Sequence, residues 1–89
     1  MKTKVLNYRV IVESELLKKK TIYVAYAPSL GISDFGETID LAVANIEKAI
    51  KIYLDTLSDL KKPIPEPDRE EYFITTRHIE VPEYQFAYA

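Results

Sequence analysis

Apolar and polar residues alternate through the first third of the chain. In residues 4–13 the apolar side chains of one face take every second position: Leu6, Tyr8, Val10 and Val12. This period of two predicts a half-buried strand. A second alternating run, residues 21–27, follows the polar segment 14–20, so we expect an antiparallel hairpin whose turn lies in that segment. Pro28 ends the second strand because its nitrogen cannot donate to a sheet.

The next stretch, residues 28–37, contains both glycines of the chain, Gly31 and Gly36. A short third strand is expected between them, around residues 32–35. We expect Gly36 to adopt a positive φ in a turn directly before a helix, because glycine takes that conformation without steric cost.

An amphipathic helix follows. Thr38 is a favourable N-cap, and Asp40 places negative charge in the first turn. Apolar residues then recur at spacings of three and four: Ile39, Ala42, Val43, Ile46, Ala49, Ile50, Tyr53, Leu54 and Leu57. This stripe predicts a helix of about 22 residues that covers a sheet, with Ile46 and Ile50 buried at its centre.

Beyond the helix, prolines at alternate positions keep residues 61–71 extended. Residues 72–81 are rich in aromatic and β-branched side chains and read as a last strand, which Pro82 ends. The predicted fold is therefore a single α+β domain, residues 1–82, with element order β-β-β-α-β. It has an antiparallel sheet of three to four strands and one long helix, and residues 83–89 form an aromatic tail.

Composition limits the kinds of chemical site that the chain can form. The chain has 89 residues, a formal net charge of −2 and no cysteine, which excludes disulfides and thiolate metal sites. The N-terminal residues do not resemble a signal peptide, and no apolar run reaches the length of a membrane span, so we expect a cytoplasmic protein. One methionine and three side-chain amides are a weak indication of a thermophilic source.

No residue pattern indicates catalysis. The acidic candidates for two-metal chemistry, Glu13, Glu37 and Glu47, are spread over different predicted elements, and nothing in their spacing brings them together. His78 is the only histidine and lacks the spacing of a metal site, so we interpret it as a strand residue facing solvent. We expect a binding protein without enzyme activity, metal or cofactor.

The order of short motifs between residues 8 and 67 is similar to that of the HicB family of antitoxins. The first half of the series is Tyr8-Arg9-Val10-Ile11-Val12, Tyr23-Val24-Ala25, Pro28, Leu30, Gly31 and Gly36-Glu37-Thr38. The second half is Ala42, Asn45, Ala49-Ile50, Tyr53-Leu54 and Ile64-Pro65-Glu66-Pro67. No single motif is specific to this family, but the order and spacing of all of them together are specific to it.

This resemblance implies a partial ribonuclease-H-like fold and an oligomer. It also implies an antitoxin that neutralises a small, basic, RNA-cleaving toxin of the HicA kind by covering its active face. Two departures matter. The loop Leu30-Gly31-Ile32 is one residue shorter than the family's leucine-proline-glycine-cysteine. Only 22 residues follow Pro67, and they read as a strand, so the DNA-binding module of longer family members is not expected.

Two sets of residues are candidates for contact with partners. Asp34, Glu37 and Asp40 cluster beside the glycine turns and are expected to bind the toxin, because loops carry function and acidic groups suit a basic partner. The tail residues Tyr84, Phe86 and Tyr88 either pack within the protomer or between subunits of a homodimer or even-numbered oligomer, or remain disordered.

The alternative function is a small nucleic-acid-binding module of the helix-on-sheet type. Such a module needs a basic face, and the only basic run is Lys18-Lys19-Lys20. Three lysines in a turn do not make such a face, so the antitoxin-like reading is preferred.

Overall fold

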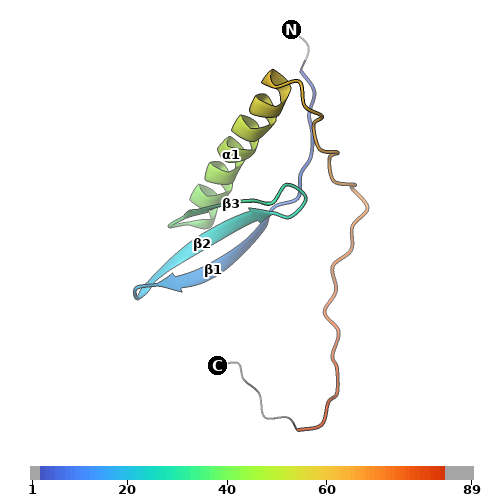
Figure 1. The fold of residues 1–89 in the computed structure, drawn as a ribbon. Coiled ribbons are helices and arrows are strands. Elements are labelled where there is room, and N and C mark those ends of the chain that lie inside the picture. The colour runs from blue at the N-terminus through green and yellow to red at the C-terminus, as the bar shows by residue number, and fades with distance from the viewer. Residues whose placement is uncertain (1–2, 84–89) are drawn as a thin grey trace.

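The computed structural model describes residues 3–83, which form a three-stranded antiparallel sheet with one helix packed across it (Figure 1). The elements follow in the order β1 (Ile11–Leu17), β2 (Lys20–Ala27), β3 (Ile32–Gly36) and α1 (Ile39–Asp59). The spatial order is β1-β2-β3, so β2 is the central strand and β1 and β3 are the edges. The predicted α+β class is confirmed, with the order β-β-β-α.

The hairpin of β1 and β2 closes on a turn of only two residues, Lys18 and Lys19. Leu17 pairs with Lys20, and both turn lysines have a positive φ, 51° and 67°. Two consecutive positive φ angles match the right-handed twist of the flanking strands, although lysine adopts them at a steric cost. The turn lies within the segment 14–20 where it was predicted, and the residues of that segment before it continue β1 to Leu17.

β1 also begins later than the predicted residues 4–13. Its first pair is Ile11 with Tyr26, and β2 ends one residue later at Ala27, so the residues before Ile11 have no strand to pair with on that side. Residues 3–10 instead run extended along the second half of α1 (Figure 1).

β2 turns into β3 through a tight loop. The carbonyl oxygen of Ala27 accepts hydrogen bonds from the N–H groups of Leu30 (3.1 Å) and Gly31 (2.9 Å). Gly31 has a φ of 67°, which explains the glycine at this position. Ala27 then pairs with Ile32, so the short third strand expected between the two glycines is confirmed.

The core lies between the sheet and the first half of α1. Ala25 and Ala27 from β2 and Ala42 and Ile46 from α1 are each 0% exposed. The three alanines allow the helix to approach the sheet closely, and Ile46 supplies the one large side chain of this centre. The predicted burial of Ile46 is confirmed. Ile50 is only partly buried, because it lies where residues 3–10 have replaced the sheet as the facing surface.

Gly36 is needed for a reason other than the one predicted. It does not have a positive φ. Instead, a Cβ at this position would stand 2.6 Å from the backbone nitrogen of Ala42 and 2.8 Å from the Cβ of Leu41. Glycine is therefore required by the close approach of the end of β3 to the first turn of α1.

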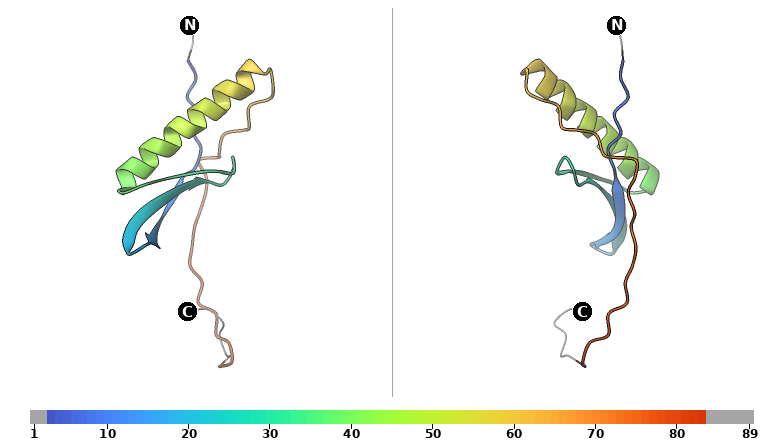
Figure 2. Two further views of the ribbon diagram at one scale, coloured as in Figure 1. Left: turned by 60° about the vertical axis from the view of Figure 1, so that its left-hand side comes forward. Right: turned by 90° about the vertical axis from the view of Figure 1, so that its right-hand side faces the viewer.

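The predicted last strand, residues 72–81, is not formed. Residues 70–83, called the arm below, run extended past the sheet and continue beyond it (Figure 2). Figure 1 shows that the arm diverges from the edge strand β1, and it pairs with no strand of its own chain within the described residues. Tyr84, Phe86 and Tyr88 lie outside the described residues. No helix within residues 3–83 is long and apolar enough to cross a membrane.

Candidate partner-binding site

A shallow hollow of about 450 Å³ lies at the start of α1. Its lining residues come from β2 and from the junction of β3 and α1: Tyr23, Glu37, Thr38, Ile39 and Asp40. Two of the three predicted partner-binding residues, Glu37 and Asp40, thus lie together in one concave surface. This surface, called the helix-start hollow below, is the candidate site.

The backbone of the hollow is fixed by the cap of the helix. Thr38 has extended backbone angles, and its Oγ1 accepts a hydrogen bond from the N–H of Leu41 at 3.1 Å, as predicted for an N-cap. Asn45 adds a second link, because its Nδ2 donates to the carbonyl oxygen of Phe35 at 2.8 Å. The end of β3 is thereby tied to the second turn of α1, and the carboxylates between them are carried on rigid backbone.

Glu37 is part of an ion pair that crosses from the hairpin to the helix start. The Nζ of Lys20 lies 2.5 Å from the Oε1 of Glu37. This hydrogen bond, together with the positive charge of Lys20, lowers the pKa of Glu37. Asp40 is exposed in the first helical turn, where the helix dipole favours a negative charge. The lowered pKa favours the charged form of Glu37, and Asp40 places a second acidic side chain in the same hollow.

Asp34 is placed differently from the other two predicted residues. Its Oδ1 accepts a hydrogen bond from the backbone N–H of Phe35 at 2.8 Å, and it does not line the hollow. An apolar side chain that sequence reasoning did not assign to the site accompanies the acids, since Ile39 lines the hollow and is 52% exposed. Ile39 had been counted in the core stripe, since a helix pattern cannot reveal where the sheet beneath it ends.

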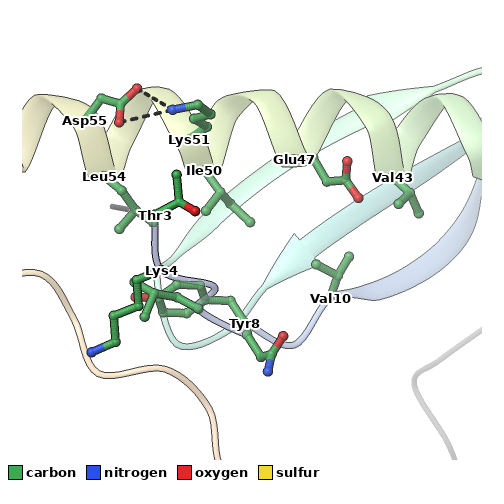
Figure 3. Close-up of a pocket in the computed structure, with 12 residues that line it drawn as sticks. Thr3, Lys4, Tyr8, Val10, Val43, Glu47, Ile50, Lys51, Leu54 and Asp55 are labelled. Atoms are coloured by element: carbon green, nitrogen blue, oxygen red, sulfur yellow. Dashed lines mark hydrogen bonds and ion pairs between the residues drawn. The ribbon is translucent and has the colours of Figure 1, made fainter. Parts of the chain in front are cut away.

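A larger cleft of about 690 Å³ lies between residues 3–10 and the second half of α1 (Figure 3). Val43, Ile50 and Leu54 project into it from the helix, and Val10 faces them from below. Its margin is charged, with Glu47 and the ion pair of Lys51 with Asp55 at 3.0 Å. No pattern in the sequence predicted this cleft, because it depends on the path of residues 3–10 alongside α1.

The proline-containing connector is tied to the N-terminal segment by a group of polar contacts centred on Asp68. Its N–H donates to the carbonyl oxygen of Asn7 at 2.8 Å, and its carboxylate accepts from the N–H of Arg9 and from the hydroxyl of Ser29. The hydrogen bonds from Ser29 and from the Arg9 backbone lower the pKa of Asp68. This contact group, called the Asp68 strap below, fixes the point from which the arm leaves.

Two further contacts reinforce the strap. The hydroxyl of Tyr8 donates to the carbonyl oxygen of Pro65 at 2.5 Å, and burial, followed by the negative charge of Asp68, raises the pKa of Tyr8. The guanidinium of Arg9 donates to the carbonyl oxygen of Arg69 at 2.8 Å and lies 3.4 Å from the ring centre of Tyr72. The first residues of the arm are therefore held against the body.

Within residues 3–83, no group of three or more histidine, aspartate or glutamate side chains is arranged to hold a metal ion. His78 lies exposed on the arm, and the strand in which it was placed is not formed there.

Comparison with known proteins gives one informative relative. A UPF0150 protein of Synechocystis sp. is 36% identical over 63 residues, which cover 70% of this chain and 76% of the relative. The chain belongs to the UPF0150 family. No family model matches the sequence, and no solved structure matches it. The helix-start hollow and the Asp68 strap are therefore features of a UPF0150 protein.

Proposed function

We propose that this UPF0150 chain is a HicB-like antitoxin that neutralises a small, basic, RNA-cleaving toxin by direct contact. Membership of a family of small proteins and the motif order between residues 8 and 67 support the proposal. In this role the chain performs no chemistry itself. It acts by covering the basic surface with which the toxin would hold RNA.

The observation that carries the proposal is the composition of the helix-start hollow. Glu37 and Asp40 supply negative charge on rigid backbone, and the exposed Ile39 supplies apolar contact area beside them. Binding sites between proteins commonly combine apolar anchors with a charged rim. Complementary charge accelerates association with a basic partner and disfavours partners of the wrong sign.

The test is co-expression with the product of the adjacent reading frame, followed by affinity capture at low salt. Reversal of both charges in the variant Glu37→Lys/Asp40→Lys is expected to slow association about tenfold or more, since steering by charge contributes at least that factor. The matched control is Glu66→Lys, which reverses an exposed charge on the connector. It is expected to bind like the unmodified chain.

Salt gives a second readout. The association rate of the unmodified chain is expected to fall as ionic strength rises, and that of the charge-reversed variant is expected to depend on salt much less. If two folded proteins form no complex at low salt, the proposed function is wrong. If they form one that is unaffected by the double reversal, the toxin binds elsewhere on the chain.

A further inference from the structure

The arm carries a large apolar surface that its own chain leaves uncovered. Its large apolar side chains are exposed to different extents: Tyr72 52%, Phe73 93%, Ile74 76%, Ile79 76% and Val81 48%. These residues occupy a stretch of extended backbone with the composition of a strand. Single chains seldom leave so much contiguous apolar surface in water.

The body of the fold has a matching unsatisfied feature. β1 pairs with β2 only, so along Ile11–Leu17 the outer edge of the strand has no strand partner within the described residues. A free edge presents N–H and C=O groups that can pair with an added strand. At about 3.3 Å per residue, this edge is roughly 23 Å long and the arm roughly 46 Å, so the arm is long enough to cover it.

The side chains of the two segments are complementary in pattern. Four alternate residues of β1 lie on the face away from the helix. The two outer ones are apolar and the two inner ones are acidic: Ile11, Glu13, Glu15 and Leu17. Alternate positions of the arm begin and end with an apolar residue and carry a basic one between: Phe73, Thr75, Arg77 and Ile79. If the apolar ends of the two segments are aligned, antiparallel pairing places Arg77 opposite Glu13 and parallel pairing places it opposite Glu15.

The root of the arm explains why the arm does not cover its own edge. The Asp68 strap and the stacking of Arg9 on Tyr72 fix the first residues of the arm against residues 7–9. From that point the arm and β1 run in different directions, as Figure 1 shows. A second copy, in contrast, offers the same edge without this constraint.

We propose that the arm of one chain adds as a fourth strand to the free edge of β1 in a second copy, and that the second copy returns its own arm. Each partner gives the same segment and receives the same segment, which is the self-complementary arrangement of a two-fold dimer. Each arm brings five large apolar side chains and two arms are exchanged, so the interface is expected to reach the range of about 1,200–2,000 Å² typical of stable complexes.

This inference is independent of the toxin. It also differs from the expectation based on Tyr84, Phe86 and Tyr88, because it names a different segment and the edge that receives it. The absence of cysteine from the chain permits a direct test by engineered disulfides. One chain carries Thr75→Cys, and a second chain with a cleavable tag carries Glu13→Cys or Glu15→Cys.

Under oxidation, mixed single-cysteine chains are expected to form a disulfide-linked heterodimer, because Thr75 of one copy meets Glu13 or Glu15 of the other. The control is Thr75→Cys mixed with Lys48→Cys, on the outer face of α1, which is expected to give little of this product. The proposal is overturned if Thr75→Cys forms a disulfide with either β1 position only when both are in the same chain.

Charge reversal tests the same contact without cross-linking. Arg77→Glu and, separately, Glu13→Lys/Glu15→Lys are each expected to raise the dimer dissociation constant about tenfold or more, and the combination is expected to restore much of the loss. Sedimentation equilibrium from about 1 to 100 μM measures this, and circular dichroism confirms that each variant is folded. An intact chain that is monomeric throughout, or a dimer indifferent to all three changes, would contradict the exchange.

Discussion

The backbone nitrogen of Ala42 lies 2.6 Å from the point where a Cβ on Gly36 would stand. That separation is far below van der Waals contact, and the obstructing atoms belong to backbone that the Thr38 cap holds in place. Gly36→Ala is therefore expected to lower the free energy of unfolding by about 1–3 kcal/mol, the usual cost of overpacking. Urea unfolding of the purified variant measures the change.

Gly31 provides the matched comparison. A Cβ there meets no atom within 4 Å, but its φ of +67° is unfavourable for other residues. Gly31→Ala is expected to cost about 1–2 kcal/mol through the left-handed conformation alone. Gly31→Asn is expected to recover part of that loss, since asparagine tolerates this region, whereas Gly36→Asn should be no better than Gly36→Ala. Equal behaviour of the two sites would mean that contact at Gly36 is not the cause.

Ile46 is the largest fully buried side chain of the core. Ile46→Ala is expected to lower the free energy of unfolding by about 2–5 kcal/mol, through lost burial and the cavity left behind. The control is Ile52→Ala in the same helix, whose side chain is 66% exposed and which is expected to change stability by no more than about 0.5 kcal/mol. A similar small change at Ile46 would mean that the helix face is misassigned.

The turn between β1 and β2 offers a stabilising change. Lys18 and Lys19 both adopt a positive φ, whereas asparagine followed by glycine is the preferred pair for such a turn. Lys18→Asn/Lys19→Gly is expected to raise the free energy of unfolding by about 1 kcal/mol or more. Lys18→Gln/Lys19→Gln controls for the lost charge, because it keeps the strained backbone, and it should not reproduce the gain in thermal or urea unfolding.

Local patterns in the sequence were sufficient for the parts of the fold that local interactions decide. The Thr38 cap, the helical stripe and the alternation in β2 each depend on neighbours a few residues apart, and each is found in the structure. The start of β1 was predicted too early, because it depends on where β2 ends rather than on the residues of β1. Alternation continues through Tyr8 and Leu6, but it cannot supply a partner strand.

The candidate site also combines features that neighbouring residues determine with features that depend on contacts between distant elements. Glu37 and Asp40 were chosen because they cluster in sequence beside the glycine turns, and the structure places both in the helix-start hollow. The ion pair of Glu37 with Lys20 and the exposure of Ile39 depend on contacts between elements, which no local pattern reveals. The strand-like composition of residues 72–81 predicted a strand that the structure does not contain, because composition does not supply the partner strand that pairing requires.

Asp68 joins three separate parts of the chain, since it binds the backbone of Asn7 and Arg9 and the side chain of Ser29. Its pKa is lowered in the folded protein, chiefly by the hydrogen bond from Ser29 and then by that from the Arg9 N–H. The ionised carboxylate therefore stabilises the folded state. This contribution is complete above the ordinary aspartate pKa of about 4, and it is lost as the pH falls through the lower folded value.

Asp68→Asn is accordingly expected to destabilise the protein more at pH 7 than at pH 3, because pH 3 lies below the ordinary aspartate pKa and part of the contribution is already lost there. Guanidinium unfolding of both proteins at several pH values measures the difference. Asp55→Asn, which removes the exposed ion pair with Lys51, is expected to change stability at pH 7 by no more than about 0.5 kcal/mol. If Asp68→Asn lowered the free energy of unfolding by the same amount at every pH, the negative charge of Asp68 would not contribute to the strap.

The same variant links the strap to the arm. Asp68→Asn weakens the side-chain contacts with Arg9 and Ser29, which help to hold the segment that directs residues 70–83 away from their own β1. Arg9→Ala removes the stacking on Tyr72 and the bond to Arg69 but leaves the backbone bond to Asp68 possible. If the strap sets the direction of the arm, Asp68→Asn is expected to shift the protein from dimer toward monomer more than Arg9→Ala does, as measured by light scattering at equal concentration. If Arg9→Ala instead lowers the dimer fraction more than Asp68→Asn does, the stacking of Arg9 on Tyr72 rather than the Asp68 strap sets the direction of the arm.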